Sequence, residues 1–231
     1  ISSATSANTD REKLAKLRLM SNSKRPTLIM IDGHAVAYRQ YYALPVEAFS
    51  TRLGEPTNAT YGFARTLLDI LEKDSPDYLL VAFDQGTSNR DKLYAEYKGT
   101  RDKMPDDLRK QMDRIRELAQ AFNIPILEIE GYEADDILGT LAAQAEGEGL
   151  DVLIVTGDRD LLQLVTEHTH VRLPPGRWTK TDQLYDLRAF REKYALEPHQ
   201  LVDLKALMGD ASDNIPGIKG IGEKTATQLL Q

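Results

Sequence analysis

Apolar residues along the chain fall into short runs that alternate with longer amphipathic segments. The runs are continuous, which is typical of strands that are buried on both faces of a sheet. Between the runs, apolar residues recur at helical spacing, as Leu108, Met112, Ile115 and Ala119 do. Strands that alternate with helices predict an α/β fold with a mainly parallel sheet flanked by helices. The predicted strands are 27–31, 78–83, 124–129 and 151–156, and the predicted helices are 61–73, 106–122 and 133–145.

The two ends of the chain depart from this alternation. Residues 1–25 are rich in Ser, Thr and Asn and then in charge, and we expect a flexible tail with one short helix. Because the first residue is Ile rather than Met, we expect a fragment or a processed product. Residues 184–231 have mostly helical character. We therefore predict a tail over 1–25, an α/β core over 26–183 and a helical region over 184–231.

Three of the four predicted strands lead directly into acidic residues. Asp32 follows the first strand and Asp84 the second, whereas Asp158 and Asp160 follow the fourth. The third strand leads into a helix start that carries three more acids. The ligand site of an open α/β sheet lies beyond the carboxyl ends of its strands, so we expect all these acids to share one cleft. The acids at the helix start are Glu133, Asp135 and Asp136.

Each acid also has an ordinary structural explanation. A single Asp after a strand usually forms a turn or caps a helix, and acids at a helix start complement the helix dipole. These explanations account less well for the meeting of all the acids at one edge of a sheet, because closely packed carboxylates repel one another unless cations neutralise them. Mg²⁺ and Mn²⁺ suit oxygen ligands, and two such ions about 4 Å apart promote phosphodiester cleavage. The pattern therefore predicts two divalent ions at this edge.

The composition narrows the class of protein. The absence of Cys excludes a disulfide scaffold, a thiolate zinc site and a cysteine nucleophile. No apolar run reaches the roughly 18 residues that span a bilayer, so we expect a cytoplasmic protein without a membrane partner. The 231 residues include 29 Lys and Arg against 36 Asp and Glu, a net charge of −7. At face value this charge disfavours a nucleic-acid partner, because such domains usually carry a basic footprint.

A Gly-rich stretch near the end of the chain has the pattern of a helix-hairpin-helix DNA element. The backbone N–H groups of such a turn hold phosphates and give little sequence specificity. We expect the two Ile residues to anchor the turn in the core, and Asp210 and Asp213, just upstream, to lie within reach of the acidic cleft. The candidate DNA-binding residues are Gly217, Ile218, Lys219, Gly220, Ile221, Gly222 and Lys224.

A basic segment follows Asp84. Residues 89–103 hold five basic side chains with Tyr94 and Tyr97 interleaved. Such a run is usually a solvated surface. Directly after an acid of the predicted metal site, it can instead serve as a lid that steers phosphates. The strongest candidates for this role are Arg90, Lys98 and Arg101.

Six motifs occur in the order typical of one known family. They are IDGHAVAYR (31–39), AFD (82–84), YKGTR (97–101), EGYEADD (130–136), TGDRD (156–160) and GDASDNIPG (209–217). Over residues 26–231 the chain resembles the 5′-nuclease (5′-3′ exonuclease and flap endonuclease) domain of bacterial DNA polymerase I, within the flap endonuclease superfamily. Asn89, where the family usually has Phe, and the segment 173–179 depart from its pattern.

The resemblance implies a PIN-like core, a helical arch over about 85–122 and a helix-3-turn-helix element that is truncated at Gln231. It implies that Arg90, Lys98 and Arg101 belong to the arch, that Tyr38 stacks on a base near the scissile phosphate, and that the hairpin can hold K⁺. It further implies that two Mg²⁺ or Mn²⁺ ions are bound by the family's acidic cluster, here Asp32, Asp84, Glu133, Asp135, Asp136, Asp158, Asp160, Asp210 and Asp213.

We therefore expect a structure-specific, metal-dependent 5′ nuclease for flapped, nicked or 5′-ended DNA. We also expect a monomer of the nucleoid region, with a DNA polymerase domain linked to it in the native chain. The alternatives are a PIN-type ribonuclease, which would lack the hairpin, and a non-catalytic DNA binder, which would have lost acids. Without the nine cluster acids, 27 acidic residues would face 29 basic ones, so the remaining surface would be mildly basic at +2.

Overall fold

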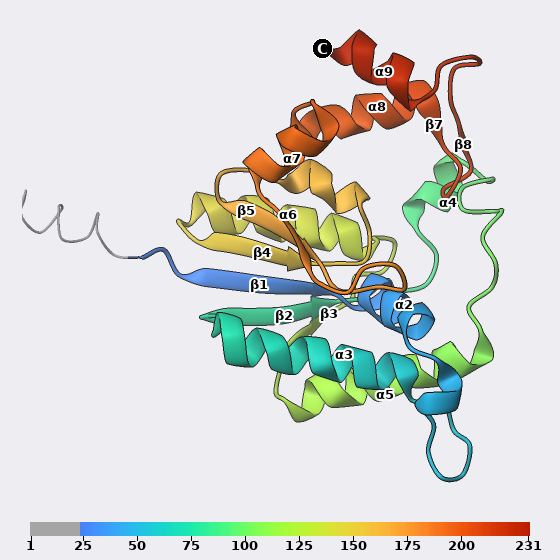
Figure 1. Ribbon diagram of the computed structural model, residues 1–231, viewed down its shortest axis with the longest axis vertical. Coiled ribbons are helices and arrows are strands. Elements are labelled where there is room, and N and C mark those ends of the chain that lie inside the picture. Colours follow the sequence, from blue (N-terminus) through green and yellow to red (C-terminus); the bar gives the residue numbers. More distant parts are fainter. Residues whose placement is uncertain (1–23) are drawn as a thin grey trace, which may run out of the picture.

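The computed structural model describes residues 24–231 (Figure 1). The predicted tail and its short helix lie outside the described residues, apart from Lys24 and Arg25. The Arg25 guanidinium donates hydrogen bonds to the carbonyl oxygens of Glu146 at 3.1 Å and Leu150 at 2.9 Å. Arg25 therefore belongs to the folded core and not to the tail. Within residues 24–231, every helix is too short or too polar to cross a bilayer.

A single six-stranded sheet forms the centre of the molecule, in the order β3-β2-β1-β4-β5-β6. Neighbouring strands from β3 to β5 are parallel, and β6 is antiparallel to β5. The predicted α/β class with a mainly parallel sheet is thereby confirmed. The strands are β1 (Thr27–Asp32), β2 (Tyr78–Ala82), β3 (Ile126–Leu127), β4 (Asp151–Val155), β5 (Thr169–Leu173) and β6 (Gln183–Tyr185).

Helices cover both faces of the sheet, because successive side chains of a strand point to opposite faces. Ile29 and Ile31 pack in one core cluster with α2, α3 and α5, whereas Leu28 and Met30 pack in the other with α6. The two layers are visible in Figure 1 on either side of β1. Their helices are α2 (Gly33–Ala43), α3 (Asn58–Asp69), α5 (Asp106–Ala121) and α6 (Ala134–Gly147).

The C-terminal helices extend the second layer. Phe190, Leu201, Leu204 and Ala226 are buried in the same cluster as Met30 of β1. The boundary predicted between residues 183 and 184 falls inside β6, which pairs with β5 in the sheet. The elements of this region are α7 (Leu187–Tyr194), α8 (Leu201–Met208), β7 (Gly209–Asp210), β8 (Ile215–Pro216) and α9 (Glu223–Leu230).

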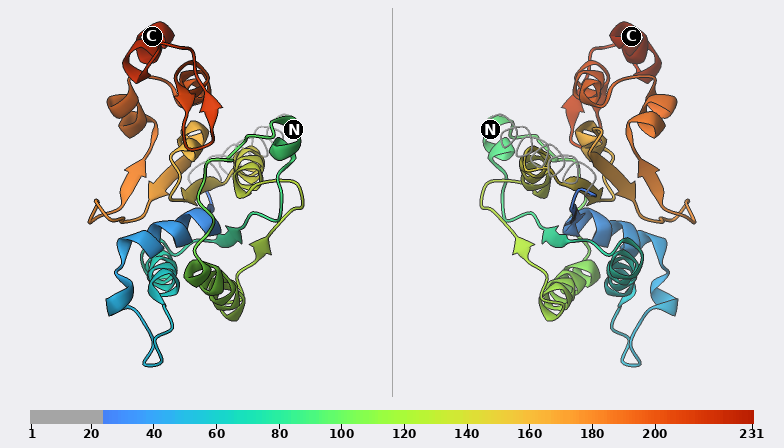
Figure 2. Two further views of the ribbon diagram at one scale, coloured as in Figure 1. Left: turned by 90° about the vertical axis from the view of Figure 1, so that its right-hand side faces the viewer. Right: turned by 90° about the vertical axis from the view of Figure 1, so that its left-hand side faces the viewer.

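The segment between β2 and α5 runs past the acidic edge of the sheet (Figure 2). It begins with the five-residue helix α4 (Asn89–Leu93), and α5 then packs against the sheet through Leu108, Met112 and Ile115. The interval of about 85–122 that we predicted for an arch therefore includes a core helix, because the apolar stripe of α5 is buried. The remaining short helical turns are η1 (Val46–Ala48), η2 (Ile70–Asp74), η3 (Asp160–Leu164) and η4 (Pro198–Gln200).

Candidate active site

The carboxyl end of β1 places Asp32 at the centre of the site. Asp32 is the last residue of β1 and the N-cap of α2, where its Oδ1 accepts a hydrogen bond from the Ala35 N–H at 2.9 Å. Its Oδ2 accepts a hydrogen bond from the Thr156 hydroxyl at 2.8 Å, and only 4% of the residue is exposed. The capping role and the predicted site role thus coincide in one side chain, since both need a carboxylate at this position.

Asp84 links the next strand to the start of α6. It follows β2 and Phe83, and its Oδ1 accepts a hydrogen bond from the Ala134 N–H at 2.6 Å. The backbone N–H of Asp84 donates to Nδ1 of His34 at 3.2 Å, so this ring nitrogen is the acceptor and carries no proton. These contacts hold the ends of β2, α2 and α6 together at one point.

Two acids at the start of α6 are paired with basic residues, Arg90 of α4 and Lys98 of the segment between α4 and α5. The Lys98 ammonium donates to Oε2 of Glu133 at 2.8 Å, and the Tyr97 hydroxyl donates to the same oxygen at 3.1 Å. The Arg90 guanidinium binds both oxygens of Asp136 at 2.7 Å. This bidentate interaction lowers the pKa of Asp136.

The turn after β4 adds Asp158 and Asp160. The Asp158 N–H donates to the Thr156 hydroxyl at 2.9 Å, and the Asp160 N–H donates to Oδ1 of Asp158 at 2.8 Å. The turn is therefore held by its own side chains. Asp160 also accepts a hydrogen bond from Lys205, a residue of α8.

Asp160 forms a compact triad with Asp210 and Asp213. One carboxylate oxygen of each lies within 4.8 Å of those of the other two, a spacing that could hold one metal ion. Asp210 accepts hydrogen bonds from the Lys205 ammonium at 2.6 Å and from the Ser212 N–H at 2.8 Å. Although burial acts in the opposite direction, these bonds lower the pKa of Asp210 to about 2.

In contrast to Asp210, Asp32 and Asp135 have raised pKa values. Burial raises the pKa of Asp32 to about 7, despite the hydrogen bonds from Ala35 and Thr156. Burial, followed by the charges of Asp32, Asp158 and Asp84, raises the pKa of Asp135 to about 8. Carboxylates that are buried beside other carboxylates take up protons unless a cation balances their negative charge. The donor set, which consists of carboxylate oxygens, fits a hard divalent cation.

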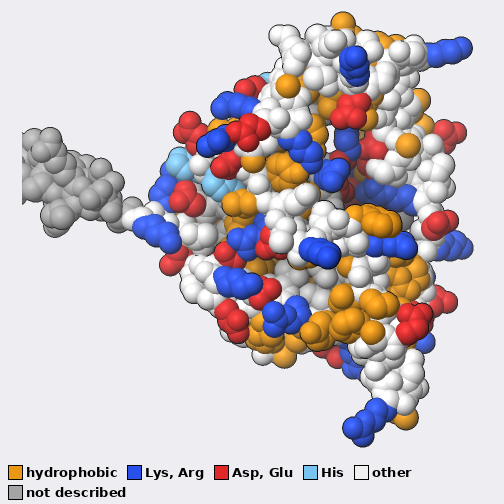
Figure 3. Space-filling view, in the orientation of Figure 1, with side chains coloured by type: hydrophobic (Ala, Val, Ile, Leu, Met, Phe, Trp, Pro, Cys, Tyr) orange, Lys and Arg blue, Asp and Glu red, His pale blue; other side chains and the backbone are white. Residues whose placement is uncertain are grey.

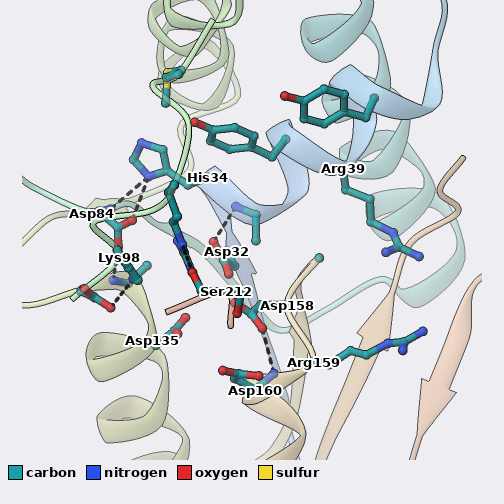
Figure 4. A pocket seen from close by; sticks show the side chains of 18 of the residues that line it. Asp32, His34, Arg39, Asp84, Lys98, Asp135, Asp158, Arg159, Asp160 and Ser212 are labelled. Carbon is teal, nitrogen blue, oxygen red and sulfur yellow. Dashed lines mark hydrogen bonds and ion pairs between the residues drawn. The ribbon is translucent and has the colours of Figure 1, made fainter. Parts of the chain in front are cut away.

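The acids line two adjoining clefts. The first cleft has a volume of about 860 Å³, and Figure 4 shows Asp32, Asp84, Asp135 and Asp158 pointing into it. The second cleft measures about 610 Å³ and lies between α6 and the C-terminal helices. Asp136, Asp210 and Asp213 line only the second cleft. The acids that line both clefts are Glu133, Asp135 and Asp160.

The structure thus brings all nine predicted acids to one edge of the sheet, but it divides them between two clefts. In the space-filling view, acidic and basic side chains lie together in a hollow below the C-terminal helices (Figure 3). The metal-binding role of the nine acids stays a prediction.

The predicted basic residues and Tyr38 lie at the same edge. Lys98 and Arg101 line the first cleft and Arg90 lines the second. The backbone N–H of Lys98 donates to the Asp213 carbonyl oxygen at 2.9 Å, and the Arg101 guanidinium pairs with the Asp213 carboxylate. Tyr38 lines the first cleft with its ring stacked 6.4 Å from that of Tyr42. The catalytic roles expected for these side chains stay predictions.

The Gly-rich hairpin lies between α8 and α9, and within residues 24–231 it contributes no side chain to either cleft. Gly217 lies so close to the Met208 backbone that a Cβ atom would come within 2.4 Å of it, so the turn requires glycine there. The expectation that both Ile residues anchor the turn is wrong for Ile218, which is 53% exposed. Ile221, in contrast, packs against the core. The turn is short, and its sharp reversal directs only one of the two side chains inward.

Several contributors to the site were not predicted from the sequence. Lys205 binds Asp160 and Asp210, Tyr97 binds Glu133, and Ser212 binds Asp210. Tyr97 and Ser212 lie within motifs that the sequence had already marked. The only signal for Lys205 was its position one helical turn before the acids at 210–213.

These features define a class of protein: an α/β domain whose acidic cleft, at the carboxyl edge of a parallel sheet, is rimmed by Lys and Arg. The family model for the 5′-3′ exonuclease N-terminal resolvase-like domain matches residues 27–195. The model for the 5′-3′ exonuclease C-terminal SAM fold matches residues 196–231. The chain belongs to the 5′-3′ exonuclease family.

Curated relatives carry the name DNA polymerase I. The relative from Chloroflexus aurantiacus is 52% identical over 208 residues, which cover 89% of this chain and 22% of that protein. The relative from Bacillus subtilis is 48% identical over 210 residues, which cover 90% of this chain and 24% of that protein. The chain thus spans about a quarter of the length of these relatives.

Solved structures share the fold. The flap endonuclease of bacteriophage T5, in a pseudo-enzyme–product complex with DNA and metal ions, has a TM-score of 0.70 and 25% identity. That match covers 88% of this chain and 74% of the T5 chain. Flap endonuclease-1 from Methanococcus jannaschii has a TM-score of 0.61 and 20% identity, over 89% of this chain and 70% of its own.

Proposed function

We propose that this chain is a divalent-metal-dependent, structure-specific nuclease that hydrolyses DNA phosphodiesters at 5′ flaps, nicks and 5′ ends. The observation that carries the proposal is the meeting of nine acids, from segments far apart in the sequence, in two adjoining clefts rimmed by Arg and Lys. Membership of the 5′-3′ exonuclease family supports the same activity. A non-catalytic DNA binder is less consistent with this arrangement, because all the acids are retained.

The clefts suit two Mg²⁺ or Mn²⁺ ions, one in each. Asp32, Asp84, Asp135 and Asp158 would hold the first ion, and the triad of Asp160, Asp210 and Asp213 would hold the second. When bound, the two ions would supply Lewis-acid chemistry that makes water nucleophilic and neutralises the leaving oxygen. Glu133 and Asp136 bind Lys98 and Arg90 and so set the position of these cations beside the ions.

The chain's own residues bind and orient the DNA. Arg101 and Lys98 lie at the mouth of the first cleft, where they attract the scissile phosphate and its neighbours. Tyr38 offers an aromatic face for an unpaired base beside this phosphate, and its stacking partner Tyr42 is 58% exposed. Contacts of this kind depend on the shape of the DNA rather than on its sequence, as expected of a structure-specific enzyme.

The hairpin provides a second DNA contact outside the clefts. The backbone of 217–222 and Lys224 bind the phosphates of the downstream duplex, and the family resemblance supports a K⁺ ion at this turn. We include in the proposal a linked polymerase domain, because the matched relatives are DNA polymerases of about four times this length. We further propose that the protein acts as a monomer in the nucleoid region.

Cleavage of a 5′-labelled flap substrate tests the proposal. The wild-type protein should release the flap with Mg²⁺ or Mn²⁺ and not with EDTA, and Asp158→Ala should lose this activity. Asp203→Ala is a matched control, because Asp203 is an exposed acid on α8 outside both clefts. Cleavage that persists in EDTA, or equal cleavage by Asp158→Ala and wild type, would reject the metal mechanism. Tight flap binding without cleavage under any metal would favour the non-catalytic binder.

A further inference from the structure

Lys205 lies between two acids of the second cleft. It belongs to α8, five residues before Asp210, and its ammonium donates to Oδ2 of Asp210 at 2.6 Å. The same ammonium donates to Oδ1 of Asp160, which comes from the turn after β4. One ammonium therefore joins two carboxylates whose positions in the sequence are 50 residues apart.

The acids that Lys205 joins belong to the candidate metal triad. Oxygens of Asp160, Asp210 and Asp213 lie within 4.8 Å of one another, a separation at which three negative charges repel strongly. The third acid, Asp213, is paired with Arg101. Every carboxylate of the triad is thus paired with a cation of the protein itself, but two cations face three carboxylates, so one negative charge remains.

The first cleft is different. Among residues 24–231, neither Asp32 nor Asp135 forms a hydrogen bond or an ion pair with Lys or Arg. Asp32 is bound only by the Ala35 N–H and the Thr156 hydroxyl. An ammonium that joins two acids is therefore a feature of the second cleft and not a general feature of the acidic edge.

We propose that Lys205 is an internal counter-cation of the second metal site: it holds Asp160 and Asp210 together in the metal-free protein and competes with the divalent ion for the same oxygens. The inference rests on the proposed function, because it takes the triad as a metal site. An oxygen lone pair that accepts a hydrogen bond from an ammonium cannot bind a metal ion at the same time. The two cations therefore oppose each other, and each lowers the affinity of the triad for the other by the same factor.

This competition has two measurable consequences. Lys205 stabilises the metal-free fold, because it offsets the repulsion between the acids that it joins. It also weakens metal binding at the triad, because the ion must displace the ammonium. The first cleft should therefore bind its ion at a lower metal concentration than the second.

Metal binding by the full chain without DNA tests the inference. Mn²⁺ is titrated into wild type and Lys205→Met by calorimetry or electron paramagnetic resonance, and the Tm of each protein is measured in EDTA and in saturating Mn²⁺. In Lys205→Met we expect the weaker Mn²⁺ site to tighten by roughly fivefold or more. We also expect the Tm to fall by about 3 °C in EDTA and by much less in Mn²⁺.

Three further variants separate this role from others. Lys110→Met removes one positive charge from the exposed face of α5, outside both clefts, and should leave the weaker site unchanged. Lys205→Arg should preserve the Tm in EDTA. In an Asp210→Asn background, Lys205→Met should lose most of its effect on metal affinity, because the joined pair of acids no longer exists.

The outcomes separate this inference from the proposed function. An unchanged or weaker second site in Lys205→Met would overturn the counter-cation role, and so would an equal loss of Tm with and without Mn²⁺, as expected of a merely structural lysine. A variant that loses only DNA affinity would instead make Lys205 a phosphate contact. If the wild type binds no Mn²⁺ at all, the proposed function fails together with the inference.

Discussion

The two clefts of the acidic edge both bring carboxylates close together, but they differ in how the repulsion between these carboxylates is offset. In the first, Asp32 is buried and Asp135 half-buried, and within residues 24–231 neither forms an ion pair with Lys or Arg; their pKa values rise to about 7 and about 8. In the second, Lys205 and Arg90 bind acids directly, which lowers the pKa of Asp136 and brings that of Asp210 to about 2. The pKa of Asp160 is raised all the same, because burial and the charge of Asp158 outweigh its bond from Lys205. Both clefts are lined by carboxylates and by Lys or Arg, but the three acids that line only the second cleft are all ion-paired.

This difference indicates how the two sites depend on metal. The first cleft needs an external cation to be stable with its carboxylates ionised, so an ion bound there stabilises the fold directly. In the second cleft, Lys205, Arg90 and Arg101 offset part of the negative charge without an ion. The acids of the cluster are therefore not equivalent, and the same Asp→Asn substitution should have different effects in the two clefts.

Loss of an acid of the first cleft should have the largest effect on cleavage. Asp135→Asn removes a carboxylate that lines both clefts, and we expect flap cleavage to fall by roughly 10³-fold, the order seen when a principal electrostatic group of an active site is lost. Single-turnover cleavage in Mg²⁺ measures this. Asp203→Asn, on the exposed face of α8, should cleave at the wild-type rate. A rate for Asp135→Asn within a few fold of wild type would contradict the central role of this acid.

Loss of the cation that binds Asp136 should have the next largest effect. Arg90→Ala should slow cleavage by about 10²-fold through misplacement of the phosphate, while flap binding weakens far less. Parallel measurements of single-turnover rate and equilibrium binding separate the two quantities. Arg114→Ala, which removes an exposed arginine paired with Glu117 on α5, is the control. Weaker binding at an unchanged rate would place Arg90 away from the scissile phosphate.

The direction in which the Tm changes in the absence of metal should distinguish the two clefts. Asp135→Asn removes a half-buried carboxylate that forms no ion pair within residues 24–231, so we expect the Tm in EDTA to rise by about 3 °C. Asp210→Asn leaves Lys205 with a weaker partner, so we expect the Tm to fall by a similar amount. Differential scanning fluorimetry in EDTA and in Mn²⁺ measures both shifts. Shifts of the same sign would show that the clefts do not differ in the proposed way.

The smallest effect is expected at the hairpin, outside both clefts. Lys224→Ala should weaken duplex binding by a modest factor and reduce the slope of log affinity against log salt by about 1, because one phosphate contact is lost. Binding isotherms at several salt concentrations provide the slope. The single-turnover rate at saturating enzyme should stay unchanged, and a large loss of rate would mean that the hairpin acts within the clefts.

Much of the fold could be predicted from local pattern. The continuous apolar runs of β1, β2 and β4 identified the central strands, because strands buried on both faces have no polar positions. Strand β5 was missed because it alternates: Thr169, Val171 and Leu173 are buried, whereas His170 and Arg172 are not. Helix α2 was missed because it lacks a continuous apolar stripe: besides Val36, it buries only Gly33, Ala37 and Gln40.

The sequence was enough to predict which acids form the site, but not which residues pair with them. Seven acids were recognisable because they follow a strand or lie at the start of a helix, and Asp210 and Asp213 because they lie just upstream of the Gly-rich hairpin. Nothing local indicated that Lys205 would contact Asp160, which lies 45 positions away, or that Ile218 would be exposed while Ile221 packs against the core. Contacts of this kind depend on how α8 docks on the sheet, and that docking is a sum of many weak packing terms.

The sequence by itself determined the chemistry that this protein carries: apolar runs that become a parallel sheet, acids at the ends of its strands, and basic residues in the segment after Asp84. These are local properties, set by side-chain type and by the period of a strand or a helix. The tertiary structure alone decided that the acids occupy two clefts, that Lys205 joins Asp160 and Asp210, and that the hairpin lies apart from both clefts. Burial and Coulomb energies depend on distances between residues far apart in the chain, and only the folded arrangement sets those distances.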